Sequence, residues 1–210
     1  MKNKRIFILL FLLVFIIFFI IFLNLKIQQS NWASVKKYNE IKRDNNPILL
    51  SALKQIGVVK EYDTNYYNGG YPPDDKGACS DVIIRALLDN EYNLKNKIDK
   101  DFKEHKERYD DNIDPNINFR RVKNIKIFLD NYAEKLTTEI NSSTLEYWEP
   151  GDIVTYGQIP GGLWHIAIIS DRKNKNGIPL LIHNHGFGTT ENDLLLNWPS
   201  KISGHYRINL

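Results

Sequence analysis

The chain has 210 residues, of which 28 are lysine or arginine and 25 are aspartate or glutamate, giving a formal net charge of +3. Three of the basic residues lie before residue 6, so residues 26–210 carry 25 of each sign and no formal net charge. A neutral domain is a poor binder of polyanions, which excludes nucleic acid from the expected partners. The single cysteine, Cys79, excludes a disulfide within the chain.

The N-terminal run Ile6–Leu23 is apolar and uncharged. About 20 such residues cross a bilayer, so we expect a transmembrane signal-anchor helix over 6–25. Basic residues beside a span stay in the cytoplasm, which makes 1–5 a cytoplasmic tail and places the rest of a single-pass membrane protein outside the cytoplasm. The alternative is a cleaved signal peptide and a secreted protein. However, the run is longer than a usual signal core, and no Ala-x-Ala-like site follows it.

Residues 26–46 are polar and predict a stalk, so the soluble domain is expected to span 47–210. Apolar residues at helical spacing predict a helix over 48–56 that Gly57 ends. A turn-rich loop follows over 62–78, with three glycines, two prolines and four tyrosines. Loops of this length in compact domains are usually functional or disordered, and tyrosines favour a functional role because they offer flat contact area and a hydroxyl.

Helical spacing continues after this loop and then gives way to strand-like segments. We expect a helix that begins at or just after Cys79, a charged helix over 94–109 and a third over 122–132. Turn signals rich in glycine and asparagine then separate expected strands at 136–140, 152–156, 163–170, 178–183 and 205–209. Helices followed by an antiparallel sheet predict an α+β domain.

Cys79 is the strongest candidate for a catalytic residue. A helix N-terminus lowers the pKa of a thiol, and the thiolate is the nucleophilic form. Such a nucleophile needs a base and a group that holds the base. Alternation along the strand puts His165 on one face with Ala167 and Ile169, and the next strand ends in His183. Neighbouring antiparallel strands would place the two histidines side by side.

The late histidines leave a second interpretation open, which is a metal-dependent amidase. His165, His183, His185 and His205 follow one another, and His183 and His185 alternate on one strand face. A zinc site needs three or four ligands with second-shell acids, and no compact zinc spacing is present. We therefore expect no metal and no other cofactor.

The succession GACSDVIIRALL, PNINFRRVKN, EPGDIVTYG, HIAIIS, IHNHGFG and SGHYR resembles the bacterial family called domain of unknown function 1287. That family is similar to NlpC-type cell-wall peptidases of the papain-like superfamily, and the resemblance covers about residues 48–209. It implies a papain-like α+β fold in which Cys79 attacks, His165 is the base and His183 orients it. Two departures are Ala-Cys-Ser-Asp at 78–81, where NlpC-type enzymes read Asp-Cys-Ser-Gly, and Asn-Phe-Arg-Arg at 118–121 in place of an Asp-His-Arg-Arg-like run.

Several polar residues are candidates for binding substrate, each with a structural alternative. Asp81 caps the first turn of its helix or pairs with Arg85 one turn later. Arginines in tandem hold a carboxylate bidentately or brace loops. His205 is expected to support the sheet edge. The candidate substrate-binding residues are Tyr62, Asp63, Tyr67, Asp81, Arg120 and Arg121.

The resulting expectation is a membrane-anchored extracytoplasmic cysteine hydrolase. Its implied substrates are amide bonds of peptidoglycan stem peptides or a related envelope amide or ester. An inactive module that binds wall peptide and an acyltransferase on the same fold remain as alternatives, and the metal-dependent amidase is a third.

Overall fold

The computed structural model describes residues 19–22, 26, 44–110, 112–159 and 162–210. Residues Asp44–Leu210 form one compact unit. The expected cytoplasmic tail, and most of the expected transmembrane helix and stalk, lie outside the described residues. In the part of the chain that is described, no helix has both the length and the apolar composition needed to cross a membrane.

The folded unit begins three residues earlier than expected. Helix α2 (Pro47–Leu53) has Asn46 as its N-cap, whose side chain accepts a hydrogen bond from the backbone N–H of Leu49 at 3.0 Å. Proline in the first helical turn loses no hydrogen bond, and an asparagine cap satisfies an otherwise free donor. The backbone N–H of Asp44 also donates to the carboxylate of Asp171 at 2.7 Å. Residues 44–46 therefore belong to the domain and not to the stalk.

Three further helices lie where the periodicity predicts them. These are α3 (Cys79–Leu88), α4 (Leu94–Glu104) and α5 (Val122–Tyr132). The expected helix over 94–109 is too long, because the backbone of His105 leaves the helical region and a short 3₁₀ turn, η1 (Lys106–Arg108), follows. Two more 3₁₀ turns are η2 (Asn118–Arg120) and η3 (Leu145–Tyr147).

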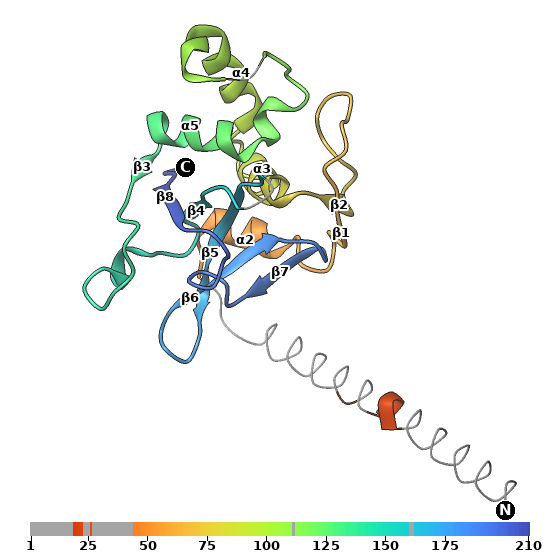
Figure 1. Ribbon diagram of the computed structural model, residues 1–210, viewed down its shortest axis with the longest axis vertical. Helices are drawn as coiled ribbons and strands as arrows, with labels where there is room; N and C mark the ends of the chain where they lie inside the picture. Colours follow the sequence, from red (N-terminus) through yellow and green to blue (C-terminus); the bar gives the residue numbers. More distant parts are fainter. Residues whose placement is uncertain (1–18, 23–25, 27–43, 111, 160–161) are drawn as a thin grey trace, which may run out of the picture. The chain divides into compact units, whose positions relative to one another are not determined.

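The second half of the domain forms one antiparallel sheet, which confirms the α+β class (Figure 1). Its strand order is β3-β8-β4-β5-β6-β7. The strands are β3 (Glu134–Lys135), β4 (Ile153–Tyr156), β5 (His165–Lys173), β6 (Pro179–Asn184), β7 (Thr189–Asn192) and β8 (Ile202–Arg207). A separate parallel pair, β1 (Glu61–Tyr62) and β2 (Lys76–Gly77), closes the tyrosine-rich loop just before α3.

Three details of the sheet differ from the sequence expectations. The segment 136–140 is not a strand; β3 ends before it, and only the N–H of Leu136 continues the pairing, to the carbonyl of His205. Strand β7 was not expected, since Thr-Thr-Glu-Asn lacks alternating apolar residues. The expected strand over 205–209 is β8, which starts earlier and lies between β3 and β4, so His205 is not at the sheet edge.

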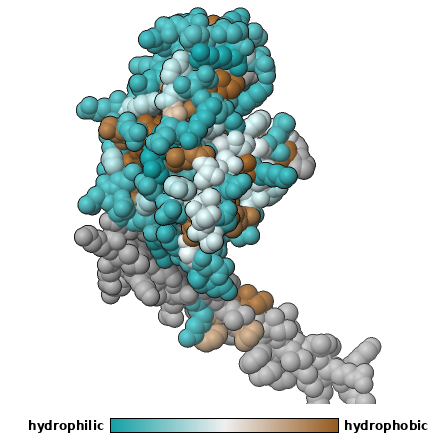
Figure 2. Space-filling model, turned by 90° about the vertical axis from the view of Figure 1, so that its left-hand side faces the viewer, coloured by the Kyte–Doolittle hydropathy of each residue, from teal (hydrophilic) through white to brown (hydrophobic). Residues whose placement is uncertain are grey.

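The two faces of the sheet pack against different partners, as the alternation in β5 predicts. Ile166 and Ile168 join the core under α2 and α3, whereas Ala167 and Ile169 join a smaller cluster with Trp148 and other side chains from loops. Polar residues remain outside, and the face drawn in Figure 2 is mostly hydrophilic with small, separate hydrophobic areas. The sheet therefore has a helix face and a loop face.

Gly204 on β8 is required by its neighbour Tyr206. A Cβ atom at this position would overlap the hydroxyl and ring atoms of Tyr206, which is 1% exposed. We expect Gly204→Ala to lower the free energy of unfolding by about 1–3 kcal/mol, because overpacking forces a buried ring to move. Urea denaturation measures the change. Gly157→Ala is the matched control, since its Cβ would find only an ordinary contact at 3.7 Å, and equal losses for the two variants would contradict this account.

Candidate active site

Cys79 is the first residue of α3, as predicted, and it faces an open cavity. Ala78 is the N-cap, and its extended backbone turns the chain from β2 into the helix. The cavity has a volume of about 450 Å³ and is lined by residues of the tyrosine-rich loop, the start of α3, the start of α5 and the segment before β5. Tyr62, Cys79, Arg121 and Trp164 are among them. The cavity size is within the range of small-ligand sites.

The environment of the thiol corrects the expected direction of its pKa. The backbone N–H groups of Ile166 and Ser80 and the hydroxyl of Tyr62 all favour the thiolate. Burial is the larger effect, because Cys79 is 3% exposed and a buried charge loses its hydration. Burial therefore raises the pKa of the Cys79 thiol to about 11, although the residue sits at a helix N-terminus. Burial likewise raises the pKa of Tyr62.

His165 and His183 lie together on the loop face of the sheet. Nε2 of His165 is 2.6 Å from Nδ1 of His183, and Trp198 stacks on the His165 ring at 3.8 Å between centroids. Burial, with a smaller contribution from neighbouring imidazoles, lowers the pKa of His165 to about 2 and that of His183 to about 4. Both rings are therefore neutral near pH 7.

The hydrogen bonds of this pair define where the protons are. Nε2 of His183 is 2.9 Å from Oδ1 of Asn192, which can only accept, so that nitrogen carries a proton. Nδ1 of His183 must then accept from Nε2 of His165. This leaves Nδ1 of His165 with its lone pair, and no hydrogen bond within the described residues engages it. His165 is thus in the form that a general base requires.

Cys79 reaches β5 beside His165 but is not hydrogen-bonded to it. The thiol interacts with the backbone of Ile166, the residue after His165, and belongs to the core on the helix face. The His165 ring stacks on Trp198, which packs with the cluster on the loop face. In the described chain, no hydrogen bond joins thiol and imidazole. The structure therefore brings His165 and His183 into contact and leaves Cys79 adjacent to the strand that carries the base.

A buried ion pair fixes the start of α3. Asp81 and Arg120 form two hydrogen bonds, at 2.9 and 2.8 Å, with both side chains 2% exposed. Asp81 also accepts from the N–H of Ala78 at 2.6 Å, which confirms its capping role. Arg120 donates in addition to the carbonyls of Asn65 and Asp63. The guanidinium therefore braces the tyrosine-rich loop against the helix.

Of the other candidate binding residues, some hold the tyrosine-rich loop together and others line the cavity. Tyr67 donates to the Asp63 carboxylate at 2.7 Å, which lowers the pKa of Asp63 and holds the loop together. Tyr62 and Arg121 line the cavity beside Cys79. Arg85 does not form the expected pair with Asp81; it donates instead to loop carbonyls, including that of Lys76 at 2.7 Å. Burial lowers the pKa of Arg85.

Three residues of the site were missed in the sequence. Asn192 extends the histidine pair, Trp198 stacks on it, and Asn184 donates to the carbonyl of Gly77 at 2.8 Å, tying β6 to the segment that precedes Cys79. Only Asn184 carried a signal, since it lies within the string His-Asn-His. Asn192 and Trp198 depend on the β7 pairing and the loop after it, which no local pattern indicates.

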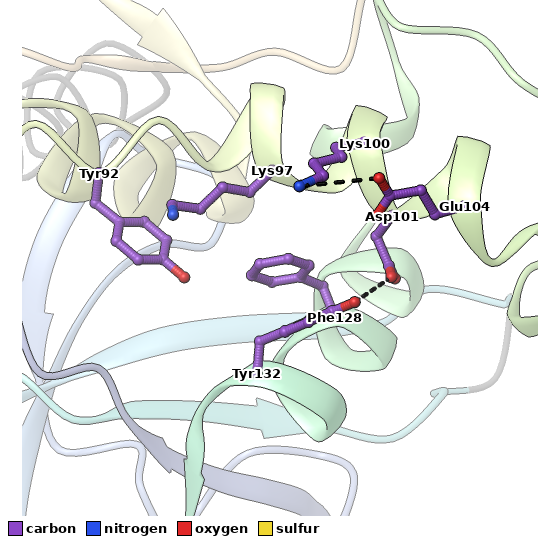
Figure 3. Close-up of a pocket in the computed structure, with 7 residues that line it drawn as sticks. All are labelled: Tyr92, Lys97, Lys100, Asp101, Glu104, Phe128 and Tyr132. Atoms are coloured by element: carbon purple, nitrogen blue, oxygen red, sulfur yellow. Dashed lines mark hydrogen bonds and ion pairs between the residues drawn. The ribbon is translucent and has the colours of Figure 1, made fainter.

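Other polar clusters have structural roles. His205 lies between the Asp152 carboxylate at 3.0 Å and the carbonyl of Thr137 at 2.8 Å, and it supports β8. A second recess, of about 410 Å³, lies between α4 and α5 (Figure 3). There Tyr132 donates to the buried carboxylate of Asp101 at 2.6 Å, which links the two helices. In the described parts of the chain, no three His, Cys, Asp or Glu side chains are grouped to hold a metal ion.

The fold and site define an α+β domain with a thiol at a helix start beside a buried histidine pair. The chain belongs to the family described as domain of unknown function (DUF1287), whose model matches residues 49–208. It is similar to the uncharacterized protein YijF of Escherichia coli (strain K12), with 37% identity over 172 residues, covering 78% of this chain and 81% of YijF. No solved structure matches the chain. The family resemblance is confirmed, and the likeness to NlpC-type peptidases stays a prediction.

Proposed function

We propose that this protein is an extracytoplasmic cysteine hydrolase that cleaves amide bonds in an envelope peptide. The observation that carries the proposal is the position of Cys79, which lines an open cavity and contacts the backbone of Ile166, next to His165, whose Nδ1 lone pair is available. A nucleophile beside a base that a third group orients is the arrangement that acyl-transfer chemistry requires.

In the proposed reaction the thiol proton moves to Nδ1 of His165 as sulfur attacks the amide carbonyl, so no free thiolate accumulates. Sulfur and carbon form a bond, the carbon–nitrogen bond breaks, and the leaving amine takes the proton from His165. Water then attacks the thioester with His165 as base, which releases the acid and regenerates the thiol. The backbone N–H groups of Ile166 and Ser80 and the Tyr62 hydroxyl are donors that interact with the sulfur.

The cavity rim suits a peptide that carries carboxylates. Arg121 and Lys123 line it, and Trp164 and the 62%-exposed Leu163 supply apolar contact area. Peptidoglycan stem peptides combine amide bonds with free carboxylates, and they lie where an exported domain would meet them. A membrane tether over residues 6–25 is part of this proposal.

Alkylation of the single cysteine tests the proposal in the full-length chain. With iodoacetamide near neutral pH, we expect the reaction of Cys79 to depend on proton transfer to His165, so that His165→Ala slows it by about 100-fold, the lower end of the range for general acid–base catalysis. His105→Ala is the matched control, because His105 lies at the C-terminal end of α4 beside Glu107 and not on the sheet that carries the histidine pair. A reaction rate that His165→Ala leaves unchanged would refute the mechanism.

A binding module is the second candidate, and the pKa values favour it. Burial raises the pKa of the thiol and lowers that of His165, so the resting site opposes proton transfer. An inactive module would bind stem peptides without releasing product. Incubation with purified stem peptides and mass spectrometry separates the two: new fragments that are absent with Cys79→Ala support the hydrolase, and binding that Cys79→Ala retains, without fragments, supports the module.

A further inference from the structure

The hydrogen-bond chain that begins at His165 continues past His183 to two residues with no assigned role. Nε2 of His183 meets Oδ1 of Asn192 at 2.9 Å, and Nδ2 of Asn192 meets Nε2 of His185 at 2.9 Å. We propose that Asn192 is a positioning residue that, through His183, fixes the proton of His165 on Nε2, and that His185 sets the orientation of the Asn192 amide. The inference rests on the proposed function, in which His165 is the base.

The direction of the chain follows from the orientation of the Asn192 amide, whose Oδ1 lies against His183 and whose Nδ2 lies against His185. An amide has one acceptor and one donor group, so its orientation decides which neighbour donates. Nδ2 of Asn192 faces two possible acceptors, Nε2 of His185 and the hydroxyl oxygen of Thr190 at 3.3 Å. Oδ1 is then left for His183, which must donate to it.

Exchanging the positions of Oδ1 and Nδ2 of Asn192 would exchange donor and acceptor in each hydrogen bond from Asn192 to His165. Nε2 of His183 would accept, its Nδ1 would donate to Nε2 of His165, and the proton of His165 would move to Nδ1. His165 would then present a donor where the proposed reaction needs a lone pair. The activity of the base therefore depends on an amide two side chains away.

The surrounding structure offers few other hydrogen-bond partners to the ring nitrogens of His165 and His183. His183 is fully buried, and Trp198 lies against both rings of the pair. The β6–β7 register places Asn192 opposite Leu181, on the loop face with His183. Glu191 falls on the other face, where it binds Arg172 at 3.1 Å, so this neighbouring acid does not enter the chain. A buried ring without a protein partner would leave a polar atom unsatisfied, which is costly.

Two substitutions of Asn192 test the inference in the full-length chain. Asn192→Asp keeps an acceptor opposite His183, whereas Asn192→Leu removes it with little change in size. Nitrogen-15 NMR of the histidine rings distinguishes a nitrogen that carries a proton from one that does not. We expect His165 to be protonated on Nε2 in the wild type and in Asn192→Asp, and to become a mixture of both tautomers in Asn192→Leu. The iodoacetamide reaction of Cys79 should slow about tenfold or more only in Asn192→Leu.

His185→Lys provides the second measurement, since lysine can only donate. It should turn the Asn192 amide and shift His165 in the same way as Asn192→Leu. An unchanged His165 tautomer in Asn192→Leu, or an equal shift in Asn192→Asp, would overturn the role of Asn192, and an unchanged tautomer in His185→Lys would overturn that of His185. If the tautomers shift as expected while His165→Ala leaves the reaction rate of Cys79 unchanged, the hydrolase proposal fails and the positioning role stands.

Discussion

Replacing Asp81 with asparagine should lower the free energy of unfolding by about 3–5 kcal/mol, the range for breaking a buried ion pair from one side. Arg120 would keep its charge in a site where its side chain is 2% exposed, with no carboxylate to compensate it. The asparagine would still offer one oxygen, but it would also bring an N–H₂ group next to the guanidinium or to the N–H of Ala78, which now donates to the carboxylate. Urea denaturation monitored by fluorescence measures the loss.

Asp99→Asn is the matched control, because Asp99 also pairs with a basic residue. Its partner Lys95 lies one helical turn away at 3.0 Å, and both side chains are near the surface of α4. Pairs of this kind contribute about 0.3–0.5 kcal/mol. If Asp81→Asn costs no more than Asp99→Asn, the ion pair does not hold the start of α3, and another contact must fix the position of Cys79.

Only part of the Asp81–Arg120 interaction can be predicted from the sequence. Capping by Asp81 and bracing by Arg120 were both among the expected roles, since each follows from a residue type at a local position. The partnership itself joins residues 39 apart in sequence. No local pattern specifies such a pair, and Arg85, the alternative partner one turn away, bonds to loop carbonyls instead.

The helices and strands show the same contrast between features set by local sequence and features set by distant contacts. Helix α3 begins where the acid in its first turn predicts, and α5 begins where apolar periodicity predicts, because these signals act within one or two turns. Strand β7 was missed because its pairing with β6, and not its own composition, makes it a strand. Its residue Asn192 was therefore missed as well, and with it the outer half of the hydrogen-bond chain.

The pKa of Cys79 was predicted in the wrong direction for a related reason. A helix N-terminus is visible in the sequence, and it does favour the thiolate through the N–H of Ser80. Burial depends on the packing of α3 against β5, which only the fold supplies. Burial is the larger effect here, since desolvation of a charge outweighs a few nearby dipoles.

Burial of the histidine pair should make the domain sensitive to acid. The pKa of His165 is lowered to about 2 and that of His183 to about 4, whereas both titrate near 6.5 in the unfolded chain. Below pH 6.5 the unfolded chain therefore binds protons that the folded chain does not. The stabilisation is complete above pH 6.5 and is lost as the pH falls toward the folded values.

Between pH 6.5 and 5 we expect the free energy of unfolding to fall by about 2–3 kcal/mol, with each histidine contributing up to about 1.4 kcal/mol per pH unit. Urea denaturation at several pH values in this window gives the slope, which counts the protons taken up on unfolding. His165→Gln should reduce that count by about one, because the group that titrates only in the unfolded chain is gone. His105→Gln, at a half-exposed position on the C-terminal side of α4, should leave it unchanged. A slope that is flat in the wild type, or that both variants reduce equally, would show that the buried pair is not the source of the acid sensitivity.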